Sequence, residues 1–199
     1  MKKLQFGVLL IAALALFAEP ILAQDNVTTD DIIQSLKPKP RTRGLGAPTL
    51  SADDAAFLNK VKHQTRGLTI EERIQITTIV STAVLPAIDL EVNFAFNSAT
   101  LEPSAVLTLQ KLGAALQSEQ LANASFLIAG HTDARGAKDY NQKLSEARAQ
   151  TVKTFLAGNF HITPDQLLAV GYGQEQLKNT ADPFADENRR VKIINLGKN

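Results

Sequence analysis

The chain has 199 residues, of which 44% are hydrophobic, with 21 basic and 20 acidic side chains. This length suits one full domain with an extension, and the balanced charge gives no support to nucleic-acid binding, which favours a concentrated basic excess. No cysteine occurs, which excludes disulfides and an anchor of lipid-modified cysteine.

The first residues predict a secretory signal peptide over residues 1–23. Lys2 and Lys3 precede an apolar run over residues 6–18, and Ala23 offers a small residue for cleavage. The run is short for a membrane span, which needs about 20 apolar residues. We therefore expect export to the periplasm of a Gram-negative bacterium, with association to the cell wall or outer membrane. An uncleaved N-terminal anchor is the alternative.

Residues 24–85 are predicted to form a linker with short helices. A short helix can start at Thr29, and residues 51–62 and 70–83 each carry acidic residues in a first turn, where the helix dipole favours them. Residues 37–44 contain two prolines among basic residues, which hold the chain extended. This segment is either a solvated spacer or a weak electrostatic contact with the anionic cell wall, and the region could also contact envelope proteins.

From Pro86 onward the pattern is more regular. Apolar and polar residues alternate over residues 88–94, which predicts a half-buried strand. A helix should start at residues 100–103, because proline is tolerated in a first turn. Its core-facing residues, at helical spacing, should be Ala105, Leu109, Leu112 and Leu116.

The remaining elements alternate in type. Residues 124–129 form an apolar strand that ends at Gly130, and residues 139–156 form an amphipathic helix that ends near Gly158. Residues 167–172 and 191–196 predict two further strands. Strands separated by helices of this length indicate an α/β (α+β) two-layer sandwich with crossover helices over residues 86–199.

An acidic and a basic residue should meet at one edge of this sheet. Asp133 follows the strand that ends at Gly130, and Arg148 lies two turns into the next helix. A carboxylate and a guanidinium at the same strand-to-helix edge suit a zwitterionic ligand, such as an amino-acid head group.

A helical wheel sharpens this expectation for Arg148. The predicted apolar face comprises Leu144, Ala147, Thr151, Val152 and Phe155. Arg148 falls inside that face, with Asn141 beside it. A guanidinium in a buried stripe costs free energy unless a charge or strong acceptors meet it. Either a ligand or an internal pair with Asp133 or Glu146 would satisfy it, and both alternatives are open.

Several spaced motifs carry a family resemblance. They are residues 94–101, Gly130-His131-Thr132-Asp133 with Gly136, Tyr140-Asn141, Leu144-Ser145, Arg148-Ala149, Gly171-Tyr172-Gly173 and Asn188-Arg189-Arg190-Val191. Through them, the chain from about residue 88 to its end resembles the OmpA-like C-terminal peptidoglycan-binding domain, which is shared with the Pal lipoproteins and the MotB stator proteins. The resemblance implies a βαβαββ order.

The resemblance also implies a ligand, since the family binds the diaminopimelate residue of the peptidoglycan stem peptide. Asp133 would pair with the ligand's α-ammonium and Arg148 with its α-carboxylate. This assignment is chemically reasonable, because arginine can donate two parallel, charge-assisted hydrogen bonds to a carboxylate. The other implied contacts are Asn97 and Asn141 as neutral hydrogen-bonding groups, Thr132 and Leu144 as pocket lining, and Arg189 at the rim, where Arg190 competes for the role.

One departure from the family pattern concerns the pocket wall. Ala95 and Phe96 stand near the place where the family often has an acidic residue, which affects fine specificity more than binding itself.

A catalytic function is less consistent with these residues. His131 beside Asp133 could suggest acid–base catalysis by a wall hydrolase, but no nucleophile motif or carboxylate pair accompanies it. His63, His131 and His161 lack metal-ligand spacing. We therefore expect a non-catalytic module without metal or cofactor, in which His131 is a satisfied strand residue.

Two further alternatives are not catalytic. One is an OmpA-like fold that serves as a protein-interaction module without wall binding. The other is a membrane-tethered, stator-like protein, if the signal is not cleaved.

Overall fold

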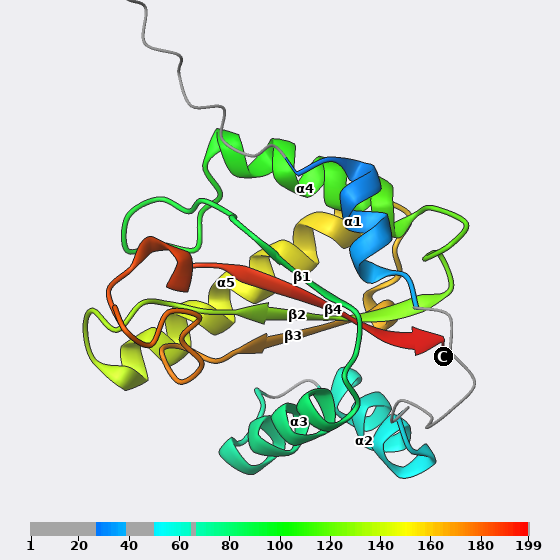
Figure 1. The fold of residues 1–199 in the computed structure, drawn as a ribbon, viewed down its shortest axis with the longest axis horizontal. Helices are drawn as coiled ribbons and strands as arrows, with labels where there is room; N and C mark the ends of the chain where they lie inside the picture. The colour runs from blue at the N-terminus through cyan, green and yellow to red at the C-terminus, as the bar shows by residue number, and fades with distance from the viewer. Residues whose placement is uncertain (1–26, 39–49, 65–66, 199) are drawn as a thin grey trace, which may run out of the picture.

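The computed structural model describes residues 27–38, 50–64 and 67–198. The predicted signal peptide and most of the basic, proline-containing segment lie outside these residues. The centre of the fold is one sheet of four strands, β1 (Ala87–Leu90), β2 (Ala124–Gly130), β3 (Leu167–Gly171) and β4 (Val191–Lys198). They lie in the order β1-β4-β2-β3 (Figure 1).

The strand pairing follows from the connections. β2 and β3 are parallel, because the helix α5 (Lys138–Asn159) crosses over between them. β4 is antiparallel to both of its neighbours, β1 and β2. With α4 (Pro103–Leu116) between β1 and β2, the chain from β1 onward reads βαβαββ, which confirms the predicted order.

The first strand is shorter than the alternation predicted. β1 ends at Leu90, which pairs with Val191, the first residue of β4. Beyond this point the chain has no partner strand, and Phe94 forms only an isolated bridge with Leu101. The alternation of apolar and polar residues continues past Leu90, but β4 offers no further residues with which these positions could pair.

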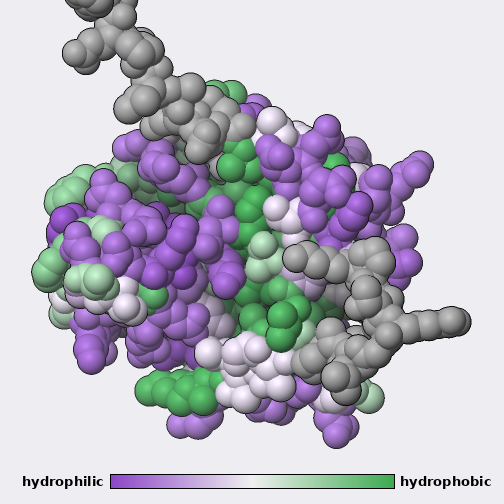
Figure 2. Space-filling model, in the orientation of Figure 1, coloured by the Kyte–Doolittle hydropathy of each residue, from purple (hydrophilic) through white to green (hydrophobic). Residues whose placement is uncertain are grey.

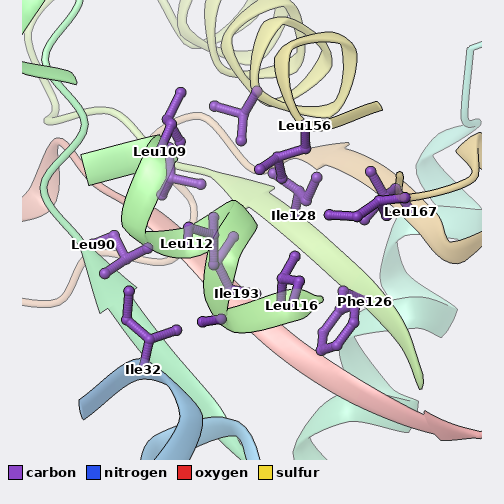
Figure 3. Packing of buried hydrophobic residues seen from close by; sticks show 14 of the residues in the cluster. Ile32, Leu90, Leu109, Leu112, Leu116, Phe126, Ile128, Leu156, Leu167 and Ile193 are labelled. Atoms are coloured by element: carbon purple, nitrogen blue, oxygen red, sulfur yellow. The ribbon is translucent and has the colours of Figure 1, made fainter. Parts of the chain in front are cut away.

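The helices α4 and α5 cover one face of the sheet and enclose the larger core. The predicted core-facing residues of α4 are all buried, and they pack against Ile128 and Ile193 of the sheet and Leu156 of α5 (Figure 3). α1 (Thr29–Leu36) joins this core through Ile32 and Leu36, both with 0% exposure. The buried Asn195 side chain donates to the Leu36 carbonyl at 2.8 Å, which ties α1 to β4.

Two helices from the N-terminal part cover the opposite face of the sheet. α2 (Ala52–Lys62) and α3 (Ile70–Thr82) form where acidic first turns predicted helices, and the side chains of Ser51 and Thr69 cap their first turns. They enclose a second core with residues of the sheet such as Leu127, Leu168 and Ile194 (Figure 1). The predicted sandwich of sheet and crossover helices is therefore present, and α2 and α3 add a third layer to it.

Two short 3₁₀ helices, Pro164–Gln166 and Asp186–Asn188, complete the fold. Within the described ranges, no helix has the length and apolar character that a membrane span requires.

The packing of α3 predicts a contrast between two of its isoleucines. Ile76 has 0% exposure, whereas Ile74 is 61% exposed on the same helix. Ile76→Ala should lower the free energy of unfolding by about 2–4 kcal/mol, because it opens a cavity, and Ile74→Ala should change it by less than about 0.5 kcal/mol. Urea denaturation measures both, and equal effects would contradict the placement of α3 on the sheet.

Candidate functional site

The site begins with a close contact between α5 and the ends of two strands. A Cβ atom at Gly130 would lie 2.3 Å from the Ser145 carbonyl oxygen, and one at Gly171 would lie 2.4 Å from the Glu146 nitrogen. Only glycine allows this approach. The Ser145 hydroxyl also accepts a hydrogen bond from the Gly173 nitrogen at 2.8 Å. The contact fixes the first half of α5 beside the loops that follow β2 and β3.

This contact corrects the predicted orientation of the helix. The buried face of α5 comprises Asn141, Ser145, Ala149, Val152 and Leu156, whereas Ala147 is exposed and Leu144 is only half-buried. The helical wheel assumes that the most apolar side chains face the core. Close packing of α5 against Gly130 and Gly171 instead requires small side chains at the contact. Arg148 therefore lies at the edge of the buried face.

Asn141 holds the loop between β2 and α5. Its side-chain nitrogen donates to the carbonyls of Asp133, at 3.3 Å, and Arg135, at 2.9 Å, and to the Gln174 side-chain oxygen at 2.6 Å. Because Asn141 is only 3% exposed, these bonds position the Asp133 backbone relative to α5.

Asp133 is buried among cationic groups. Its side chain is 8% exposed and pairs with Arg189 at 2.9 Å and Arg135 at 3.3 Å. The Arg135 backbone nitrogen donates to the other carboxylate oxygen at 3.0 Å. Arg189 also pairs with Asp186 at 2.6 Å. Burial opposes the charge of Arg189, but the hydrogen bonds that Arg189 donates to Asp133 and Asp186 outweigh this effect and raise the pKa of Arg189.

The structure separates the two adjacent arginines. Arg190 is directed to β1, where its Nε donates to Asp89 at 3.0 Å, and its terminal nitrogens contact the carbonyls of Gln176 and Asn188. Arg189, not Arg190, therefore lies beside Asp133.

Arg148 lacks a counter-charge. Its Nε donates to the Ser98 carbonyl at 3.0 Å, and its guanidinium lies 4.9 Å from the centre of the Phe94 ring. Within the described residues it has no carboxylate within 4 Å, so neither internal pair, with Asp133 or with Glu146, forms. Burial lowers the pKa of Arg148, and the nearby positive charge of Arg189 lowers it further, whereas Tyr140 and Asp133 act in the opposite direction.

The other predicted contacts lie around these charges. Thr132 is 4% exposed, and Asn97 is exposed in a left-handed conformation with a φ of 55°. The Asn97 side-chain oxygen accepts a hydrogen bond from the Tyr140 hydroxyl. A cavity of about 110 Å³ is lined by Arg148 and Arg189, together with Phe94, His131 and Asp186. The other predicted site residues do not line it.

Sequence reasoning gave no role to several residues that shape the site. Phe94, Ser98 and Tyr140 stood in the recognised motifs, but their contacts with Arg148 and Asn97 bring together segments that are more than 40 positions apart. Arg135 and Asp186 carried no sequence signal beyond their charge.

His131 contradicts the expectation of a satisfied residue. It is 2% exposed, and neither ring nitrogen has a hydrogen-bond partner in the described part of the chain. The ring stacks on Tyr172 with centroids 5.5 Å apart. Burial, with Arg190 and Lys192 nearby, lowers the pKa of His131 from 6.5 to about 3. No group of acidic, histidine or cysteine residues in the described ranges could hold a metal ion.

The described residues form a small α/β module with a cluster of charged side chains at one end of its sheet. Residues 93–190 match the model of the OmpA family. The C-terminal part of this chain is thus a domain of the OmpA family.

Named relatives agree with this assignment. The chain is 37% identical to outer membrane protein A of Buchnera aphidicola over 89 residues, which are 45% of this chain and 25% of that protein. It is 35% identical to the peptidoglycan-associated lipoprotein of Legionella pneumophila over 105 residues, 51% of this chain and 57% of that protein. The matches thus span between a quarter and somewhat over half of these relatives' own length.

Solved structures show a weaker likeness. The OmpA-like domain of FopA1 from Francisella tularensis is 20% identical with a TM-score of 0.48, covering 57% of this chain and 75% of that one. The peptidoglycan-associated lipoprotein from Burkholderia pseudomallei is 29% identical with a TM-score of 0.44, covering 52% and 87%. Because both TM-scores are below 0.5, the assignment rests on the family model and the sequence relatives.

The glycine contact yields a prediction with a matched control. Gly171→Ala should lower the free energy of unfolding by about 1–3 kcal/mol, because its Cβ would overlap α5. Gly158→Ala, where a Cβ meets nothing within 4 Å, should raise it by up to about 1 kcal/mol, because alanine favours helix. Thermal or urea unfolding distinguishes them, and a neutral Gly171→Ala would show that α5 does not lie against β3 as described.

His131 yields a pH prediction. In the unfolded chain the imidazole gains a proton near pH 6.5, but in the folded protein only near pH 3. The unfolded state therefore binds more protons between these values, and stability falls as the pH drops through this window. From pH 7 to pH 5, the wild type should lose more free energy of unfolding than His131→Phe, by at most about 1.4 kcal/mol per pH unit. Equal losses in both proteins would contradict the buried neutral imidazole.

Proposed function

We propose that this protein binds peptidoglycan through the diaminopimelate residue of the stem peptide, without catalysis, and so helps to attach or organise the cell envelope. The observation that carries this proposal is Arg148, a partly buried cation without a carboxylate partner, located near the buried carboxylate of Asp133. This arrangement is complementary to a ligand that carries an ammonium and a carboxylate on the same carbon.

The hydrogen bonds of Arg148 leave room for the ligand's carboxylate. Only its Nε bonds to the protein within the described residues, so the terminal nitrogens can donate in parallel to a carboxylate. The Phe94 ring contacts the face of the Arg148 guanidinium, so the edge that carries the terminal nitrogens is free of this contact.

Asp133 can receive the ligand's ammonium by exchanging a weak partner. The Arg135 side chain is 63% exposed, and an exposed ion pair contributes little to stability. An incoming ammonium can replace it at modest cost, while Arg189 and the Arg135 backbone keep the carboxylate in place.

The relatives support the location and the partner class. The named proteins include outer membrane proteins and a peptidoglycan-associated lipoprotein, and we assign this chain to the periplasmic side of the envelope. In this proposal Asn97, Asn141, Thr132, Leu144 and Arg189 surround the ligand or position the groups that do.

Sedimentation with purified sacculi tests the proposal. Asp133→Asn and Arg148→Ala should each weaken binding about tenfold to a hundredfold, the value of one or two hydrogen bonds to a charged group. Asp139→Ala and Lys143→Ala are the matched controls, because each removes a charge of the same sign as Asp133 or Arg148, respectively, from an exposed position nearby. Both variants should sediment as the wild type does. If wild type fails to sediment, or if Arg148→Ala sediments fully, the wall-binding site is wrong.

A competition experiment tests the diaminopimelate specificity separately. Free meso-diaminopimelate should release the protein from sacculi, because its second head group carries both an ammonium and a carboxylate. Nα-acetyl-lysine amide has the same chain length to its terminal ammonium, but both of its α-groups are blocked and it carries no carboxylate, so it should compete far less. Equal competition by both would remove diaminopimelate specificity while leaving wall binding intact.

A further inference from the structure

We propose that Phe96, Tyr140 and Phe184 form an aromatic rim around the charged site, and that this rim packs against the sugar rings of the peptidoglycan glycan strand. This inference rests on the proposed function and extends it from the stem peptide to the carbohydrate.

The exposure of these rings is the first observation. Phe96 is 97% exposed, Phe184 50% and Tyr140 43%. The other large hydrophobic residues that are exposed in the described ranges are aliphatic, and they lie on α3, the turn after it and α4: Ile70, Ile74, Val84 and Leu107. Exposed aromatic rings are therefore concentrated in the loops and helix start that build the charged site.

Two of the rings are on the Arg148 side of the site. Phe96 directly precedes Asn97, whose backbone and side-chain oxygens both contact the Tyr140 hydroxyl. In the same loop, the Ser98 carbonyl accepts the hydrogen bond from Arg148. The loop after β1 and the start of α5 thus present Phe96 and Tyr140 next to the guanidinium that would take the ligand's carboxylate.

The third ring is on the Asp133 side. The Arg135 guanidinium, which pairs with Asp133, lies 5.9 Å from the centre of the Phe184 ring. The backbone of this loop is held there too, because the Ala134 nitrogen donates to the Pro183 carbonyl at 3.0 Å. Figure 1 shows the loops after β1, β2 and β3 together at one end of the sheet. Figure 2 shows that end as mainly hydrophilic with smaller apolar patches.

The chemistry of the surface favours a carbohydrate. A sugar ring has an apolar C–H face and polar hydroxyls at its edge, so it can cover an aromatic face while its hydroxyls reach neighbouring charges. Aromatic rings with a negative face suit such C–H groups. A surface that inserts into lipid would be contiguous and apolar, whereas these rings alternate with Asp133, Arg135 and Arg148.

The geometry of the ligand places sugar within reach. In peptidoglycan the stem peptide joins the diaminopimelate residue to a sugar of the glycan strand. Three extended α-linked residues span about 10 Å, and the γ-linkage of the glutamate and the side chain of diaminopimelate lengthen this reach to roughly 20 Å at most. A head group bound between Asp133 and Arg148 therefore brings the glycan strand over the immediate surroundings of the site, where the three rings lie.

Two soluble ligands separate this rim from the charged site. One is the stem tripeptide L-alanyl-γ-D-glutamyl-meso-diaminopimelate, and the other is the same tripeptide attached to its disaccharide. Calorimetric titration of the wild-type chain should show tighter binding of the disaccharide form. Phe96→Ser and Phe184→Ser should each weaken binding of that form by roughly threefold to tenfold and change tripeptide binding less than twofold.

Leu107→Ser is the matched control, because Leu107 is 62% exposed on α4, and it should alter neither affinity. Circular dichroism verifies that the variants remain folded. If the wild type binds both ligands equally, or if Phe96→Ser weakens both ligands to the same extent, the aromatic rim is wrong while the proposed function stands. If the wild type binds neither ligand, the proposed function fails and the rim with it.

Discussion

The geometry of the candidate site depends on how closely α5 approaches the ends of β2 and β3. Gly130 and Gly171 leave no side chain between the sheet and the helix backbone, and Ser145 bonds to the loop that follows β3. This single contact determines where the first half of α5 lies. It brings Asn141 against the loop that carries Asp133, and it places Arg148, almost two turns later, at the boundary between core and solvent. An acid from a strand end and a base from a helix face become neighbours because glycine permits the helix to pack there.

The charges at this boundary are not equally compensated. Asp133 is buried and already accepts three hydrogen bonds, from two arginines and a backbone nitrogen. Arg148 has a carbonyl and an aromatic face as neighbours, and burial lowers its pKa. A partly desolvated cation with neutral acceptors alone is costly, and a bound carboxylate would relieve that cost. Arg189 contributes in a different way, because its 2.9 Å hydrogen bond to Asp133 holds that carboxylate in position.

Much of the architecture was predictable from sequence, because it depends on hydrophobic periodicity and on acidic residues in the first turns of helices. Long amphipathic segments located α4, α5 and the strands, and acidic first turns located α2 and α3. The failures have physical causes that a one-dimensional pattern does not contain. The helical wheel was only partly right for α5, because Val152 is buried and Phe155 packs against the core as predicted. Contact with glycine turns the rest of the buried face toward the small residues Ser145 and Ala149. β1 is short because its partner begins at Val191. One partner of Asp133, Arg189, is 56 positions away. The buried and unpartnered ring of His131 stacks on Tyr172 from the end of another strand, which no local motif indicates. The resemblance named the residues of the site, but it could not reveal their mutual contacts in the free protein.

The most direct test of this account is a crystal structure of the chain with the meso-diaminopimelate-containing stem tripeptide. The account predicts the ligand's α-carboxylate within about 3 Å of the terminal nitrogens of Arg148 and its α-ammonium within about 3 Å of the Asp133 carboxylate. Arg135 should have left Asp133, and the pair between Asp133 and Arg189 should remain. A head group bound elsewhere, or an Arg148 that still contacts only Ser98 and Phe94 in the complex, would contradict it.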